Sequence, residues 1–453
     1  MMNRRHFLTR LGAGATLATF GGLAGGLRKA NADASDYRAL VCVFLYGGMD
    51  NHDVVIPYDR ASYDEWARLR GGLLTAQAQP RTLENLLPIE TPGFGSRQFA
   101  LPAEMAGLHR LYTSGNAAIL GNVGPLLEPV TRRGFEDDTV RLPPRLFSHN
   151  DQQSTWMGGS PEGAREGWGG LFLDSLRRLN GAPEFSGVSM GGGELLITGR
   201  SVVPYAVSPD GAPEIHALED FFELEGELRD RVLGHLQGRH GERTHLLERD
   251  LSALSQAAFA ANERYNAATS GLPALTTEFP GGGLAGQLRG VAQAIQARSA
   301  LTACRQIFVV GMGGFDTHSN QPRNLPALQA RIDGAIVAFG RAMQELGLER
   351  QVTLFTASDF GRSLAPNDDG TDHGWGAHHF VVGGAVQGGL VYGGLPEATL
   401  SHERDAGSGR LIPDLSVEQM AAPLGRWLGL DDAALTSALP RLAAFPGELR
   451  GFL

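Results

Sequence analysis

Six short apolar runs, each ending in glycine or serine, constrain the fold of this chain more than any other feature. Runs that are apolar throughout and stop at such residues are typical of strands buried on both faces of a sheet. They read LVCVFLYGG (40–48), AAILGNVG (117–124), GVSMGGG (187–193), RQIFVVGMGG (305–314), QVTLFTAS (351–358) and HHFVVGG (378–384).

Amphipathic segments separate these runs, at 103–112, 215–236, 244–268, 284–300 and 325–346. Strands that alternate with helices predict a mostly parallel sheet covered on both faces, which is a three-layer α/β/α sandwich. We expect one such domain over residues 35–453, with a helical insertion at about 214–300. In sheets of this kind, ligands bind at the carboxyl ends of the strands.

The first 34 residues are typical of a twin-arginine signal peptide. Arg4 and Arg5 precede Phe7 and a weakly apolar Gly/Ala/Leu stretch, and small residues follow at 30, 32 and 34. The alternative is a transmembrane anchor, but the apolar stretch is shorter than the roughly 20 residues that a span needs. We therefore predict export to the periplasm or the medium, with no transmembrane segment in the mature chain.

Charge and cysteine content exclude several classes of function. The net charge of -10 argues against a nucleic-acid partner and favours a small-molecule one. The two cysteines, Cys42 and Cys304, are expected in buried strands and lie in no C-x-P-S-R-like loop, so a formylglycine sulfatase is not expected. They are too few for an iron–sulfur cluster, and no haem motif occurs.

Acidic residues and histidines follow three of the predicted strands. Asp50 follows the first run, Asp316 and His318 follow the run at 305–314, and Asp359 follows the run at 351–358. His373 lies in the polar loop that comes next. Because carboxylates gathered at one sheet edge repel one another unless they are protonated or bound to cations, this pattern predicts a divalent metal site.

Each of these residues also has a structural interpretation. An aspartate after a strand often caps the next helix by accepting backbone N–H bonds, which applies to Asp50, Asp316 and Asp359 individually. Likewise, His52 could be a loop residue and His378 could simply open a strand.

Four motifs together resemble a family of exported bacterial proteins, domain of unknown function 1501, which is itself similar to the alkaline phosphatase and sulfatase superfamily. The motifs are LYGGMDNHDVVIPY (45–58), FSHNDQQSTWMGG (147–159) with GWGGLFLD (167–174), GGFDTHSNQ (313–321) and TASDFGRSLAPNDDGTDHGWGAHHFVVGG (356–384). The resemblance covers nearly the whole mature chain. It implies an alkaline-phosphatase-like fold.

In that superfamily the central sheet holds two divalent metals, and a nucleophile at a helix start attacks a phosphate or sulfate ester. The resemblance implies that Asp50 is the ligand after the first strand, Asp316 and His318 the Asp/His pair, Asp359 the later aspartate and His373 the last histidine. The implied metal is zinc, with manganese, calcium and magnesium as alternatives. The implied partner is a small anionic ester.

The chain departs from the superfamily pattern at two points. The pair Asp316 and His318 is more tightly spaced than usual, and Phe360 replaces the histidine that normally follows the later aspartate. One metal site is therefore incomplete, or is rebuilt with His149, His52 or His378.

Ser148 is the candidate nucleophile, because it stands where a helix could begin, with Asp151 three residues on. Its alternative role is an N-cap. Ser154 and Thr155 are lesser candidates for the nucleophile.

Arg362 is the candidate anion-binding residue, since a guanidinium matches phosphate or sulfate bidentately. It could instead pair with Asp368 or Asp369. The sequence thus predicts a metal-dependent hydrolase of phosphate or sulfate esters. The alternative function is a non-catalytic binding or accessory protein that keeps the same fold.

Overall fold

A computed structural model describes residues 36–77, 80–212, 245–447, 449 and 451–453. The predicted leader at 1–34 and the predicted helix at 215–236 lie outside the described residues. The described part of the expected insertion contains two helices, α10 (Leu246–Ser270) and α11 (Gly283–Gln296).

The centre of the fold is a nine-stranded sheet in which β14 (Leu415–Ser416) pairs with β5 beside the main path. Within this sheet, the pairs between described strands are parallel except for those that β12 makes with β5 and β9. The order is β13 (Val391–Gly393), β5 (Ala117–Gly124), β12 (Ala377–Val382), β9 (Val352–Ser358), β1 (Arg38–Leu45), β8 (Arg305–Met312), β6 (Gly187–Ser189) and β7 (Tyr205–Ala206).

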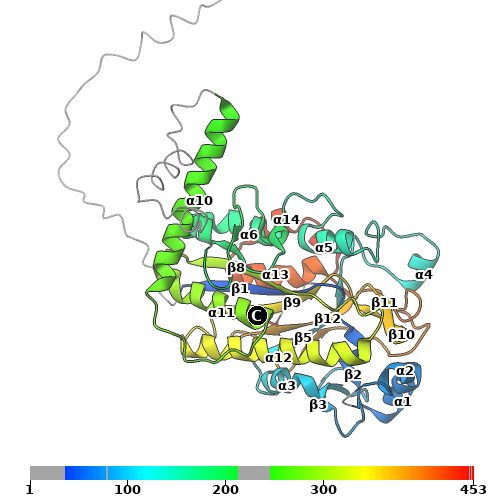
Figure 1. Cartoon of the computed structure of the whole chain (residues 1–453). Helices are drawn as coiled ribbons and strands as arrows, with labels where there is room; N and C mark the ends of the chain where they lie inside the picture. Colours follow the sequence, from blue (N-terminus) through cyan, green and yellow to red (C-terminus); the bar gives the residue numbers. More distant parts are fainter. Residues whose placement is uncertain (1–35, 78–79, 213–244, 448, 450) are drawn as a thin grey trace, which may run out of the picture. The chain divides into compact units, whose positions relative to one another are not determined.

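Side chains of the central strand β1 alternate between two hydrophobic cores. Val41 and Val43 pack with one layer of helices, and Leu40, Cys42 and Phe44 pack with the other. An apolar run on both faces is the consequence of this double burial. The structure confirms the predicted three-layer α/β/α sandwich (Figure 1).

One outer layer contains α3 (Ala106–Thr113), α10, α11 and α12 (Gln321–Glu345). The other contains α5 (His149–Gly158), α6 (Trp168–Leu176), α7 (Glu194–Ile197), α13 (Val417–Leu428) and α14 (Asp432–Ala438). Among the described helices, none is long and apolar enough to cross a membrane. Cys42 and Cys304 are buried and are not disulfide-bonded.

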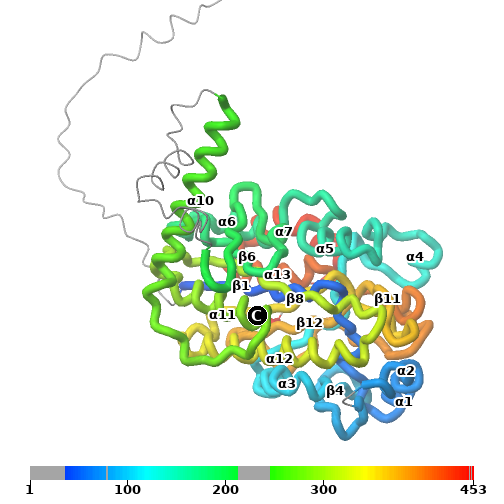
Figure 2. The backbone as a smooth tube through the Cα atoms, viewed as in Figure 1, coloured from blue at the N-terminus to red at the C-terminus, as the bar shows by residue number. Residues whose placement is uncertain are grey.

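Smaller elements lie beside the carboxyl edge of the sheet. A second sheet has the order β2 (Ile56–Pro57), β4 (Phe99–Leu101) and β3 (Leu87–Ile89), with α1 (Arg60–Leu69) and α2 (Gly71–Leu74) next in the chain to β2. A hairpin is formed by β10 (Arg362–Asn367) and β11 (Gly370–His373), and α4 (Arg132–Glu136) precedes α5. Figure 2 shows the blue segment with α1 close to the orange hairpin, and α1 contacts β10.

Candidate metal centre

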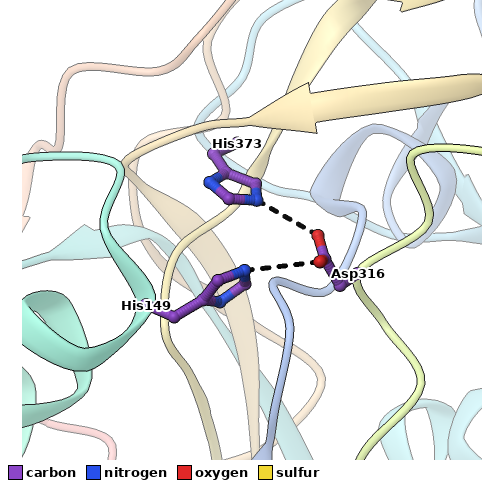
Figure 3. Close-up of side chains that lie close together, drawn as sticks. All are labelled: His149, Asp316 and His373. Carbon is purple, nitrogen blue, oxygen red and sulfur yellow. Dashed lines mark hydrogen bonds and ion pairs between the residues drawn. The ribbon is translucent and has the colours of Figure 1, made fainter.

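The carboxyl edge of the sheet brings together residues from distant parts of the chain. Asp316 follows β8, Asp359 directly follows β9, and His373 ends the hairpin that leads into the antiparallel strand β12. His149 is the first residue of α5. In Figure 3 the side chains of His149, Asp316 and His373 point toward one another.

These three side chains form a compact cluster. One potential ligand atom from each of His149, Asp316 and His373 lies within 4.8 Å of the other two. The Asp316 carboxylate is 3.1 Å from His373 Nε2 and 3.4 Å from His149 Nε2. His318 adjoins the cluster, with its Nε2 3.1 Å from Asp316 Oδ1 and 2.8 Å from His373 Nε2.

The Nδ1 atoms of His149 and His373 each donate a hydrogen bond to an acceptor outside the cluster. His149 Nδ1 donates to the Asp359 carboxylate at 2.6 Å, and His373 Nδ1 donates to the backbone carbonyl of Phe147 at 2.7 Å. Since these partners only accept, Nδ1 carries the proton in each ring, and in the neutral ring Nε2 presents a lone pair to the cluster. Metal-binding histidines are oriented in the same way.

The pKa values in the cluster shift in different directions. The hydrogen bond from His149 to Asp359 raises the pKa of His149, whereas burial lowers the pKa of His373. Burial by itself raises the pKa of Asp316. The hydrogen bond and the positive charge of Arg362 outweigh it, so the net pKa of Asp316 lies below its usual range.

Asp359 is fully buried and contacts a histidine of the cluster. Its Oδ2 accepts hydrogen bonds from His149 Nδ1, from Gln153 Nε2 at 3.0 Å and from the Gly47 amide at 3.2 Å. The structure therefore gives Asp359 the position of a residue that orients His149. In α5 the histidine and Gln153 are one helical turn apart, which brings both to the same carboxylate.

Asp50 lies in a different, buried network. Its carboxylate forms an ion pair with Arg70, accepts a hydrogen bond from Gln321 Nε2 at 2.6 Å, and caps the short helix η1 (Asn51–Asp53) through the His52 amide at 3.0 Å. Both Asp50 and Arg70 are almost completely inaccessible. The structure thus does not bring Asp50 into the cluster. Its hydrogen bond from the His52 amide is the helix cap that the sequence offered as an alternative.

Arg362 is also fully buried and holds Asp316 in place. Its Nη1 donates to Asp316 at 2.9 Å and to the Gly47 carbonyl at 3.2 Å, and its Nε donates to Thr371 Oγ1 at 3.2 Å. Its Nη2 donates to the Thr371 carbonyl. The guanidinium pairs with neither of the two carboxylates expected from the sequence, Asp368 and Asp369, and it has no exposed surface with which to meet a substrate.

In the chain, Ser148 lies between Phe147, whose carbonyl accepts a hydrogen bond from His373, and His149, which belongs to the cluster. It occupies the N-cap position of α5, but its hydroxyl makes no cap bond and donates instead to Asp151 Oδ2 at 2.8 Å. Asp151 is fixed in turn by Arg145 at 3.1 Å. The hydroxyl oxygen of Ser148 keeps its lone pairs available.

His52 and His378 do not join the cluster. His52 Nε2 lies 3.0 Å from the Gly409 carbonyl, and His378 Nδ1 accepts a hydrogen bond from the Asn122 amide at 2.9 Å. Burial lowers the pKa of each of these two histidines to about 3.

Phe360, the residue after Asp359, packs against the cluster. Its ring centre is 4.5 Å from that of His373 and 4.8 Å from that of His149. The side chain contributes an apolar wall and no ligand atom.

Sequence reasoning did not single out three residues with a clear part in these networks: Arg70, Gln153 and the carbonyl of Phe147. The spacing of His149 and Gln153 on one helix face was a usable signal. No local sequence pattern marks Arg70 or Phe147, because each of them contacts its partner only in the tertiary fold.

Together the fold and the cluster define an α/β/α protein with a histidine–carboxylate site at the carboxyl edge of a mostly parallel sheet. The chain belongs to the family described as protein of unknown function (DUF1501), whose model matches residues 37–440. This match confirms the resemblance found in the sequence motifs. No curated protein matches the chain.

Several solved structures show a distant likeness. i-CgsB in complex with k-i-k-neocarrahexaose is 9% identical over 88% of this chain and 73% of that one, with a TM-score of 0.36. The PsFucS1 sulfatase from Pseudoalteromonas sp. is 9% identical over 88% of this chain and 68% of that one, with a TM-score of 0.34. The C-terminal periplasmic domain of EcEptC from Escherichia coli, in complex with Zn, is 9% identical over 87% of this chain and 83% of that one, with a TM-score of 0.33. Likeness at this level carries no argument about chemistry.

Proposed function

We propose that this protein is an exported, metal-dependent hydrolase of phosphate or sulfate esters. The observation that carries the proposal is the inward orientation of the His149 and His373 Nε2 atoms toward the Asp316 carboxylate, with both Nδ1 atoms held from outside. Export follows from the leader predicted at residues 1–34.

The donor set fits a transition metal. Imidazole nitrogens and one carboxylate suit zinc, and they also suit manganese, whereas calcium and magnesium prefer oxygen ligands alone. We assign His149, Asp316 and His373 as ligands, with His318 as a fourth, because its Nε2 faces the same carboxylate oxygen as His373 Nε2. Asp359 and Arg362 orient these ligands.

His149, Asp316, His373 and His318 would hold the metal, which would supply positive charge to polarise an ester oxygen and to stabilise the negative charge of the transition state. The chain supplies the groups that bind and orient. Asp151 accepts the hydrogen bond of the Ser148 hydroxyl and would take its proton as the serine oxygen bonds to the phosphorus or sulfur. The bond from that atom to the alcohol oxygen would break in the same step, and the alkoxide would leave and take a proton from water. Arg362 favours the ionised form of Asp316, as its effect on the pKa indicates.

A second candidate function is an anion-binding or accessory protein without catalysis. The observation that favours it is the packing of Phe360 against the cluster, because its ring supplies no ligand atom for a second metal. Such a protein keeps the fold but does not turn over esters.

The test combines metal analysis with turnover of aryl phosphates and aryl sulfates. The protein is purified without chelators, and Ser148→Ala is compared with Ser175→Ala, an exposed serine whose hydroxyl bonds only within α6. We expect about one bound metal, and a loss of turnover of about 10²-fold or more in Ser148→Ala alone. Metal without turnover supports the accessory protein, and an absence of metal overturns the metal-dependent hydrolase.

A further inference from the structure

We propose that Arg410 is a positioning residue that holds His373 and His318 in the orientation needed to bind metal. The inference rests on the proposed metal site and adds to it a residue outside the cluster. Arg410 lies in the segment between β13 and β14, and its side chain is one quarter exposed. Its guanidinium contacts three parts of the chain that adjoin the site.

The first contact is with the backbone of a ligand. Arg410 Nε donates a hydrogen bond to the His373 carbonyl at 2.8 Å. His373 is the last residue of β11 and lies opposite Arg362 in the hairpin. Arg410 therefore fixes the end of the strand from which the His373 ring projects.

The second contact is with Phe147, whose carbonyl accepts the His373 Nδ1 proton. The Arg410 guanidinium carbon lies 5.6 Å from the centre of the Phe147 ring, within the range of a cation–π interaction. Phe147 has a φ of 71°, a left-handed conformation that is unfavourable for a residue with a bulky side chain. Packing by Arg410 helps to keep this residue, and hence its carbonyl, in position.

The third contact leads to the other histidine. Arg410 Nη2 is 3.5 Å from Asp372 Oδ2, and the second oxygen of that carboxylate is 3.6 Å from His318 Nδ1. Asp372 is further held by Asn367 Nδ2 at 3.0 Å. The positive charge of Arg410 thus fixes the carboxylate that faces the outer nitrogen of His318.

One guanidinium serves all three contacts because it is planar and carries donors on both sides. A lysine at this position keeps the charge but cannot stack on Phe147 while it also reaches the His373 carbonyl and Asp372. Loss of residues that orient metal ligands commonly weakens metal binding 10- to 100-fold. We expect a loss of this size when Arg410 is replaced.

The test measures zinc affinity by competition with a chromogenic chelator in Arg410→Ala and Arg410→Lys. Arg404→Ala is the matched control, since Arg404 lies in the same segment, donates to the Val130 carbonyl at 2.8 Å and pairs with Asp414 at 2.6 Å, away from the cluster. We expect the zinc dissociation constant to rise about 10- to 100-fold in both Arg410 variants and less than about threefold in the control. An unchanged constant in a folded Arg410 variant overturns the inference. If Arg410→Ala does not fold, Arg410→Lys decides.

A second measurement separates this inference from the proposed function. In nitrogen-15 NMR spectra of the metal-free protein, the His373 Nδ1 proton bonded to the Phe147 carbonyl should give a protected signal in the wild type and in Arg404→Ala, and should lose protection in Arg410→Lys. If the wild type binds no zinc, the proposed function fails, and this signal alone decides the positioning role. Retention of the signal in Arg410→Lys overturns that role.

Discussion

The Nε2 atoms of His318 and His373 lie 2.8 Å apart. The Nδ1 proton of His373 is already donated to a backbone carbonyl, so the Nε2 of the neutral ring is a lone pair. This lone pair can accept a hydrogen bond from His318 Nε2, and in the proposed site both nitrogens would instead bind the metal. The carboxylate of Asp316 faces both nitrogens, which is the arrangement that the proposed metal site requires.

Removal of either histidine should therefore weaken metal binding. We expect His373→Ala and His318→Ala each to raise the zinc dissociation constant by more than the roughly 10- to 100-fold caused by loss of an orienting residue, because a ligand itself is lost. Chelator competition on the purified protein measures the change. His109→Ala, which removes a half-buried histidine on α3, serves as the control, and equal affinity in all three variants would contradict the assignment.

Asp359→Asn should reduce metal affinity without removing a ligand. An asparagine can still accept the His149 Nδ1 proton but has no charge, so it orients the ring less firmly and makes Nε2 less basic. We expect the dissociation constant for zinc to rise about 10-fold, at the lower end of the effect of such substitutions. Asp174→Asn, where the carboxylate accepts backbone N–H bonds in a loop, is the control for a general loss of stability. A metal affinity that does not change in Asp359→Asn would be inconsistent with the orienting role.

Asp50→Asn should act on stability. It leaves the buried Arg70 guanidinium without its carboxylate, and breaking a buried ion pair commonly costs about 3–5 kcal/mol. The free energy of unfolding, measured by urea denaturation, should fall by about this amount, while zinc affinity stays within about threefold. A stable variant with much weaker metal binding would instead restore Asp50 as a ligand.

Acid should destabilise the folded protein through its buried histidines. Burial lowers the pKa of His379, as of His52 and His378, to about 3, against 6.5 in the unfolded chain. The unfolded chain therefore binds protons between these values that the folded protein does not, so stability is complete above pH 6.5 and is lost as the pH falls toward 3.

One substitution isolates the contribution of His379. Neither of its ring nitrogens has a hydrogen-bond partner among the described residues, so His379→Leu should fold. Near pH 5 the slope of unfolding free energy against pH should fall by up to about 1.4 kcal/mol per pH unit. Denaturant titrations at several pH values measure this slope, and an unchanged slope would show that His379 is protonated in the folded state.

Export should depend on the paired arginines of the leader. Arg4→Lys together with Arg5→Lys keeps the charge but removes the twin-arginine signal, so the precursor should accumulate in the cytoplasm. Cell fractionation and the size of the product measure the outcome. Normal export of the double variant would exclude the twin-arginine route.

The sequence by itself determined the layers and the strands. Apolar runs that end in glycine or serine are local signals of strands buried on both faces, and the amphipathic segments between them specify parallel crossovers. The same local signals predicted Asp316 and Asp359 at one edge, because parallel strands end on the same side of a sheet. The antiparallel direction of β12 followed only from the structure, since the β10–β11 hairpin before it turns the chain back.

Only the tertiary structure decided what each acidic residue contacts. Asp50, Asp316 and Asp359 look alike in local sequence, because each follows an apolar strand and a small residue. They differ in the partner that the fold delivers: Arg70 to Asp50, His149 to Asp359, and three histidines to Asp316. Those partners come from separate helices and loops, and the electrostatic energy of a carboxylate depends on the charges within a few ångströms of it, so the order of the residues along the chain cannot specify their roles.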